Sequence, residues 1–189
     1  FVFREEKVIV PVVIAVVVLL VLSAGFFIYQ SNTNKKAEAL AYDAYKTYYT
    51  LYQAQPAERA DLYRNALEKF KKTYEIRKSP FALFYMSNCY FGMGRYDEAL
   101  KALAELNEKF PDDEGFVPLS YYKMAVITLN KGDKEAALKL LDTLYNYKSA
   151  SLKDLALIES ARILESMGKA EESAKKYEEI TKSLPNSPF

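Results

Sequence analysis

The chain has 189 residues and a formal net charge of +1, enough length for one domain of ordinary size and an appendage. A balanced charge gives no general attraction for nucleic acid, so we expect no nucleic-acid partner. There is no histidine, and Cys89 is the single cysteine, which excludes histidine acid–base catalysis, Cys/His zinc sites and an intrachain disulfide. Glycine and proline are scarce, and many of the 27 aromatic residues lie in helical patterns, so we expect an all-α protein.

The first expected helix is an apolar segment from Val8 to Tyr29, and no charged residue occurs between Val8 and Asn34. As a helix, its 22 residues would span about 33 Å, which is enough to cross the hydrocarbon core of a bilayer. We therefore predict a transmembrane anchor over residues 1–30 that meets the membrane through residues 8–29.

Two other interpretations of this segment fit less well. A cleavable signal peptide has a shorter apolar core and a basic leader, whereas the leader from Arg4 to Lys7 is balanced in charge. A lipoprotein needs a cysteine after Ser23-Ala24-Gly25, where Phe26 stands. Each side of the segment has two basic residues, so the positive-inside rule does not decide its orientation. N-terminal anchors commonly precede exported domains, and we expect the C-terminal domain on the outer side of the membrane.

Residues 31–78 are predicted to form a helical linker and a degenerate first hairpin. One helix is expected over residues 36–52, a break over 53–56 and a second helix over 57–76. The second helix carries an apolar stripe of Ala66, Phe70 and Tyr74. Only the polar stretch 30–34 separates the first helix from the anchor, so the two can be one continuous helix.

The remainder of the chain, residues 79–189, contains a repeated pattern. Gly94, Gly132 and Gly168 are 38 and then 36 residues apart, and each is followed by a similar acidic and alanine-rich stretch. A period of this length is typical of stacked helical hairpins, which usually bind other proteins. We predict three hairpins of 34 residues each, over residues 80–113, 118–151 and 154–187.

These units resemble the tetratricopeptide repeat, which implies an α-solenoid of about four hairpins when the degenerate one is included. In that family, small residues at the eighth and twentieth positions let paired helices approach closely. The eighth positions hold Ser87, Ala125 and Ala161, and the twentieth hold Ala99, Ala137 and Ser173. A proline commonly closes the second helix, as Pro111 and Pro185 do here.

Two helix starts are also indicated. Ser79 before Pro80 predicts an N-cap, and Ser151 with Asp154 predicts a capping box.

The sequence offers little for catalysis. Its carboxylates fall in mixed-charge runs typical of solvated helix faces, and no glycine-rich phosphate loop occurs. Cys89 lies in an apolar helix and is interpreted as a small core residue. We predict that the protein is not an enzyme and has no catalytic residues, no cofactor, no metal and no small-molecule substrate.

A protein-binding groove is the expected site. In tetratricopeptide arrays the first helix of each hairpin lines a concave surface with about its second, fifth, ninth and twelfth residues. In the first two units these are Phe81, Phe84, Asn88, Phe91, Leu119, Tyr122, Val126 and Leu129. In the third they are Leu155, Ile158, Arg162 and Glu165. Family members that clamp an acidic C-terminus display Lys, Arg and Asn there, so this mostly apolar face argues against such a clamp.

An apolar groove of this size must be covered. It can take an apolar segment of another polypeptide, such as an unfolded client or a partner helix. The chain can also cover it with its own helix, because four tyrosines at spacings of 3, 4 and 3 share one helical face. This possible intramolecular cover consists of Tyr42, Tyr45, Tyr49 and Tyr52.

The order of anchor, helical linker and short repeat domain resembles the bacterial family of ancillary SecYEG translocon subunits (YfgM-like). The resemblance includes the linker segment 37–42 and the segment 132–144. It implies a single-pass protein of the bacterial inner membrane whose C-terminal domain faces the periplasm. There it would associate with translocon subunits and a periplasmic chaperone and help to hand over emerging proteins.

Two functions follow as hypotheses. The first is a membrane-anchored adaptor or holdase that binds proteins beside a translocation or envelope complex. The alternative is a structural accessory subunit fixed in one large membrane complex, or an envelope scaffold in division or outer-membrane assembly.

Overall fold

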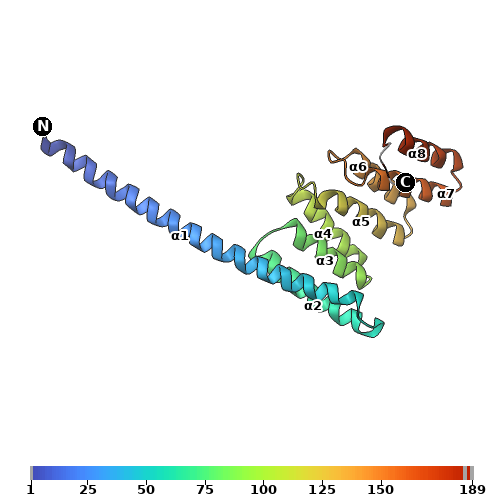
Figure 1. Ribbon diagram of the computed structural model, residues 1–189, viewed down its shortest axis with the longest axis horizontal. Helices are drawn as coiled ribbons and strands as arrows, with labels where there is room; N and C mark the ends of the chain where they lie inside the picture. The colour runs from blue at the N-terminus through green and yellow to red at the C-terminus, as the bar shows by residue number, and fades with distance from the viewer. Residues whose placement is uncertain (1, 185–186, 188–189) are drawn as a thin grey trace.

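The computed structural model describes residues 2–184 and 187, and this part of the chain is helical without strands (Figure 1). The predicted all-α class is confirmed. The elements in chain order are α1 (Val2–Tyr49), the 3₁₀ segment η1 (Thr50–Tyr52), α2 (Pro56–Ile76), α3 (Pro80–Gly92), α4 (Tyr96–Lys109), α5 (Phe116–Asn130), α6 (Lys134–Asn146), α7 (Lys153–Ser166) and α8 (Ala170–Ser183).

Consecutive helices pair as hairpins, and the hairpins stack side by side into a solenoid (Figure 1). The pairs are α1 with α2, α3 with α4, α5 with α6, and α7 with α8. Each pair also packs against the next one, so the apolar core runs through the stack from one hairpin to the following one. This is the predicted arrangement of about four hairpins in a tetratricopeptide-like array.

Helix α1 is far longer than the others, and its N-terminal half projects from the solenoid as a free rod (Figure 1). It continues through residues 30–36 without a break, because that polar stretch contains neither glycine nor proline. Side chains from Val10 to Asn32 are exposed, including Leu19 and Phe27. By length and composition this helix can cross a membrane.

The hairpins are held where a very small side chain lies between two backbones. The residues at the eighth and twentieth positions of the three units are at most 3% exposed: Ser87, Ala99, Ala125, Ala137, Ala161 and Ser173. In the first hairpin, Ala44 on α1 and Ala66 on α2 are fully buried as well. The degenerate hairpin therefore uses the same packing device as the three regular units.

The turns between paired helices need a backbone conformation that glycine adopts without strain. Gly94, Gly132 and Gly168 have φ angles of +73°, +88° and +76°, in the left-handed region. Each follows the last turn of a first helix, where a left-handed residue commonly ends a helix. The glycine spacing in the sequence thus marks the three tight turns of the regular hairpins.

Helix starts agree only in part with the sequence. The Ser79 hydroxyl accepts a hydrogen bond from the Ala82 N–H at 3.3 Å, so the predicted N-cap is confirmed. The capping box at Ser151 is wrong: α7 begins only at Lys153, after Leu152 in a left-handed conformation with φ +63°. The Asp154 carboxylate instead accepts from the Leu155 N–H at 2.8 Å.

Helix α5 begins two residues before the predicted unit, because an aspartate caps it early. The Asp113 carboxylate accepts from the N–H groups of Phe116 at 2.7 Å and Gly115 at 3.1 Å. This satisfies donors that the first turn of the helix leaves free. At the other end, the predicted closing proline of the third unit, Pro185, lies outside the described residues.

Replacing a crossing residue tests this packing. Ala137→Leu should lower the free energy of unfolding by about 1–3 kcal/mol, because Ala137 is 0% exposed and an isobutyl group overpacks the contact. Thermal unfolding of the full chain in detergent micelles, followed by circular dichroism, measures the change. Ala104→Leu, at an exposed position of α4, is the matched control and should be close to neutral. Equal losses for both variants would contradict the close approach at Ala137.

Two buried hydroxyls give a prediction of the opposite sign. The side-chain oxygens of Ser87 and Ser173 are buried and have no hydrogen-bond partner among the residues that the structure describes. An unsatisfied buried polar group is destabilising, so Ser87→Ala and Ser173→Ala should each raise the free energy of unfolding by about 1 kcal/mol. Ser120→Ala is the control, since this buried hydroxyl donates to the Asn107 side-chain oxygen at 2.6 Å and its loss should destabilise. A lower melting temperature for Ser87→Ala would refute the argument.

Candidate protein-binding groove

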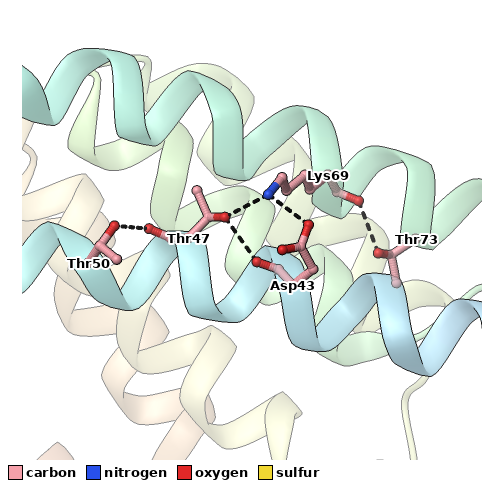
Figure 2. Close-up of polar contacts among 5 residues, drawn as sticks. All are labelled: Asp43, Thr47, Thr50, Lys69 and Thr73. Carbon is pink, nitrogen blue, oxygen red and sulfur yellow. Dashed lines mark hydrogen bonds and ion pairs between the residues drawn. The ribbon is translucent and has the colours of Figure 1, made fainter.

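Polar contacts align the C-terminal half of α1 with α2 (Figure 2). The Lys69 ammonium on α2 lies 2.7 Å from the Asp43 carboxylate on α1 and donates to the Thr47 hydroxyl at 2.9 Å. Figure 2 also shows that the Thr47 hydroxyl donates to the Asp43 carbonyl and the Thr50 hydroxyl to the Thr47 carbonyl. The Lys69 and Asp43 side chains are 36% and 55% exposed, so the ion pair orients the helices more than it stabilises them.

Behind these contacts, aromatic rings join the first two hairpins. The Tyr85 ring on α3 has its centroid 5.3 Å from both Tyr48 on α1 and Phe70 on α2. The centroids of Phe81 and Tyr85 are 4.7 Å apart, and Tyr63 lies against Tyr48 at 6.3 Å. Edge and stacked ring pairs add to the stabilisation by apolar burial, so α1 is packed into the solenoid at this point.

A hollow of about 430 Å³ opens beside this cluster, between the end of α1 and the face of α3. Its lining combines residues predicted for the groove with residues predicted for the cover. They are Tyr45, Tyr48, Tyr49, Tyr52, Phe84, Tyr85 and Asn88. We call this feature the tyrosine hollow. Residues predicted for the groove and residues predicted for the cover therefore lie around one hollow.

The four tyrosines predicted as an intramolecular cover are exposed to different degrees. Tyr45 is 38% exposed and packs against Phe81 and Tyr85, with ring centroids 6.3 and 5.3 Å apart. Tyr49 and Tyr52, at 54% and 73%, form a wall of the hollow. Tyr42 is 70% exposed and lies outside the lining residues. Three of these rings therefore bound an open space.

The other residues predicted for the groove are buried to different degrees. Six are half-buried: Phe81, Phe84, Phe91, Leu119, Tyr122 and Val126. Leu129 is more open, at 36% exposed. In the third unit Leu155 is half-buried, Ile158 is in the core beside Leu157 and Ile180, and Arg162 and Glu165 are exposed. The apolar character is thus concentrated on α3 and α5.

Two residues of this face escaped the sequence analysis. Tyr48 was passed over for its neighbours, although it lies four residues after the buried Ala44 and faces the same way. Lys123 on α5 lies with its ammonium 4.2 Å from the centroid of the Phe91 ring. It was missed because it occupies the sixth position of its unit, next to Tyr122, and only four other positions were considered.

Burial also changes how the groups around the hollow ionise. Burial, and then the nearby Tyr45, raises the pKa of Tyr85 to about 12. Burial likewise raises the pKa of the Cys89 thiol to about 12, and the pKa of Tyr48 is raised for the same main reason. Cys89 therefore stays a neutral thiol in the core. Among the described residues, no group of His, Cys, Asp or Glu side chains is arranged to hold a metal ion.

These shifts predict that stability falls in alkali. The groups have ordinary pKa values of 9.0 for Cys89 and 10.0 for Tyr48 and Tyr85, so the unfolded chain loses these protons first. Their contribution is complete below about pH 9 and is lost as pH rises toward their raised folded pKa values, which are about 12 for Tyr85 and Cys89. Thermal unfolding between pH 7 and pH 11 measures the effect. A triple variant with Tyr48→Phe, Tyr85→Phe and Cys89→Ala should show a smaller alkaline loss, and an equal loss would overturn the assignment.

Stacked hairpins, left-handed glycine turns and small crossing residues together define a tetratricopeptide-type solenoid. The sequence matches the family described as tetratricopeptide repeat-like domain over residues 7–187, and the chain belongs to that family. A TPR repeat-containing protein of Methanocaldococcus jannaschii is 39% identical over 87 residues. That match covers 43% of this chain and 25% of the relative, so the chain spans a quarter of the relative's length.

Solved structures share the fold at low sequence identity. MamA is 18% identical with a TM-score of 0.54, and the match covers 64% of this chain and 68% of MamA. The Yersinia enterocolitica type III secretion chaperone SycD, solved with a peptide of the translocator YopD, is also 18% identical with a TM-score of 0.53. That match covers 76% of this chain and 95% of SycD.

Proposed function

We propose that this protein is a membrane-anchored adaptor or holdase that binds other proteins through its concave face, beside a translocation or envelope complex. The observation that carries the proposal is the tyrosine hollow, where aromatic rings from two hairpins surround an open space of about 430 Å³. Tyr49 and Tyr52 remain more than half exposed there, although large aromatic side chains are normally buried.

The chemistry of the lining suits a polypeptide segment. Tyrosine rings present a large apolar area at low cost in side-chain entropy, and their hydroxyls can bond to a peptide backbone. Asn88 adds an amide that can both donate and accept. The open side lets an extended chain run past while one side chain enters. SycD, which has a related fold and was solved with a peptide, supports this use of the fold.

Helix α1 supports the anchored part of the proposal. Its exposed apolar half is long enough to span a bilayer, and no break separates it from the tyrosines of the hollow. Tyr45 follows Tyr29 by 16 residues, or about 24 Å along a helix. The hollow would therefore stay close to the membrane surface. Such a position suits clients that emerge from a channel, as the resemblance to translocon accessory subunits implies for the periplasmic side.

The same rigid connection favours a second candidate. A helix without a hinge fixes the solenoid relative to the bilayer, which suits a permanent accessory subunit of one membrane complex or an envelope scaffold. There the hollow would hold one partner permanently, and free and bound forms would not exchange.

Photo-crosslinking distinguishes the two functions. A photoreactive residue at position 52, on the wall of the hollow, is compared with one at position 42 on α1, in the full chain in native membranes. Adducts with many exported proteins at position 52, and few at position 42, are expected for an adaptor. A single stoichiometric partner crosslinked at position 52 would instead support a fixed accessory subunit and contradict the adaptor function. Equal labelling at both positions would reject the hollow as the binding site.

Charge placed on the wall of the hollow should abolish binding without unfolding the protein. Tyr49→Glu with Tyr52→Glu replaces two aromatic rings of the lining by carboxylates, and we expect client adducts from a probe at position 84 to fall at least tenfold. Both side chains are exposed, so the melting temperature should change little. Tyr42→Glu, also at an exposed tyrosine and on α1 outside the lining of the hollow, is the matched control and should leave the adducts unchanged. Retained crosslinking in the double variant would refute the proposed site.

A further inference from the structure

The charges on the concave face are unevenly distributed. Helices α3 and α5, which carry most of its apolar residues, contain no Asp or Glu and a single charged residue, Lys123. Lys123 is half-buried, and its ammonium lies over the Phe91 ring. A cation over an aromatic face gains some attraction, but this replaces only part of the lost hydration.

Two acidic residues of other helices are paired elsewhere. Asp97 at the start of α4 pairs with Lys131 at 2.5 Å. Glu159 on α7 pairs with Arg162 on its own helix at 2.8 Å. Within the part of the chain that the structure describes, no carboxylate lies within ion-pair distance of Lys123, and burial lowers its pKa. Among the described residues, the proposed concave face therefore carries one positive charge, on Lys123, that no carboxylate neutralises.

The distance from the tyrosine hollow to Lys123 sets the spacing between two side chains of a bound segment. Phe84 and Asn88 line the hollow, and Phe91 beneath Lys123 follows them on the same helix by seven and three residues. At about 1.5 Å per residue these offsets are about 10 and 5 Å along α3. An extended peptide advances about 3.3 Å per residue, so this gap is two or three residues of a bound segment.

We propose that the concave face binds an extended client segment in which an apolar side chain fills the tyrosine hollow and an Asp or Glu, two or three residues away, pairs with Lys123. This specificity rests on the proposed function and adds to it the chemistry of the client. The match is one of charge: an apolar groove with one uncompensated cation favours an apolar segment with one acid. The pair would form in a partly dehydrated site, where a charge-assisted contact is stronger than on an open surface.

The test uses the full chain in lipid nanodiscs and short fluorescein-labelled peptides. Each peptide has one leucine and, three residues further on, Asp, Asn or Lys, and fluorescence anisotropy gives the affinity. We expect the Asp peptide to bind about tenfold more tightly than the Asn peptide, and the Lys peptide more weakly than either. The preference for Asp should shrink as salt rises. Equal affinities of the wild-type protein for the Asp and Asn peptides would overturn the role of Lys123.

Variants separate this inference from the proposed function. Lys123→Met keeps an apolar stem without the charge, and should remove the preference for Asp while the Asn peptide binds as before. Lys139→Met, at an exposed position of α6, is the matched control and should keep the preference. Lys123→Arg should also keep the preference for the Asp peptide. Loss of this preference in Lys123→Arg would contradict a simple charge pair. If none of the peptides binds, or Tyr49→Glu with Tyr52→Glu leaves binding unchanged, the proposed function itself fails.

Discussion

Each helical hairpin depends on a contact in which a side chain larger than alanine or serine does not fit between the two backbones. Ala99 and Ala137 occupy such contacts with no exposed surface. Close pairing sets the angle between the two helices, and the repeated angle stacks the hairpins into a solenoid with the first helices along one face. The concave surface, and any site on it, is therefore a consequence of these small residues.

Because α1 and α2 use the same contact at Ala44 and Ala66, the long helix is part of the solenoid as well as its extension. Its tyrosines thus lie beside α3 as another first helix would. Aromatic packing around Tyr85 then fixes the spacing between the two helices. Helix α1 ends beside the tyrosine hollow and is followed by the short 3₁₀ segment η1. This change of helix type places the Tyr52 ring at the edge of the hollow.

The fold could be predicted from the sequence because its signals are local. They are the repeat period, the glycines of the turns and the small residues at the helix contacts. The site followed less completely. Which face of α1 turns inward depends on its rotation against α2, set by contacts such as Lys69 with Asp43 that are 26 residues apart in the chain. That rotation places Tyr48 inside and Tyr42 outside, although both belong to one tyrosine-rich stretch. The prediction of a helix start failed at Leu152, where the backbone conformation decides the start. Leu152 has a left-handed φ, which a leucine in the sequence does not indicate.

The unbroken α1 also has a mechanical consequence. In the proposed anchored state, α1 would act as a lever whose pivot lies in the membrane. Membrane helices change tilt with bilayer thickness and with their neighbours, and a tilt of about 10° acting over about 24 Å displaces the far end by about 4 Å. Such a displacement is longer than a hydrogen bond, which joins donor and acceptor over about 3 Å. In the proposed function, thinning of the bilayer or movement of an adjoining channel would thus shift the tyrosine hollow toward or away from an emerging chain.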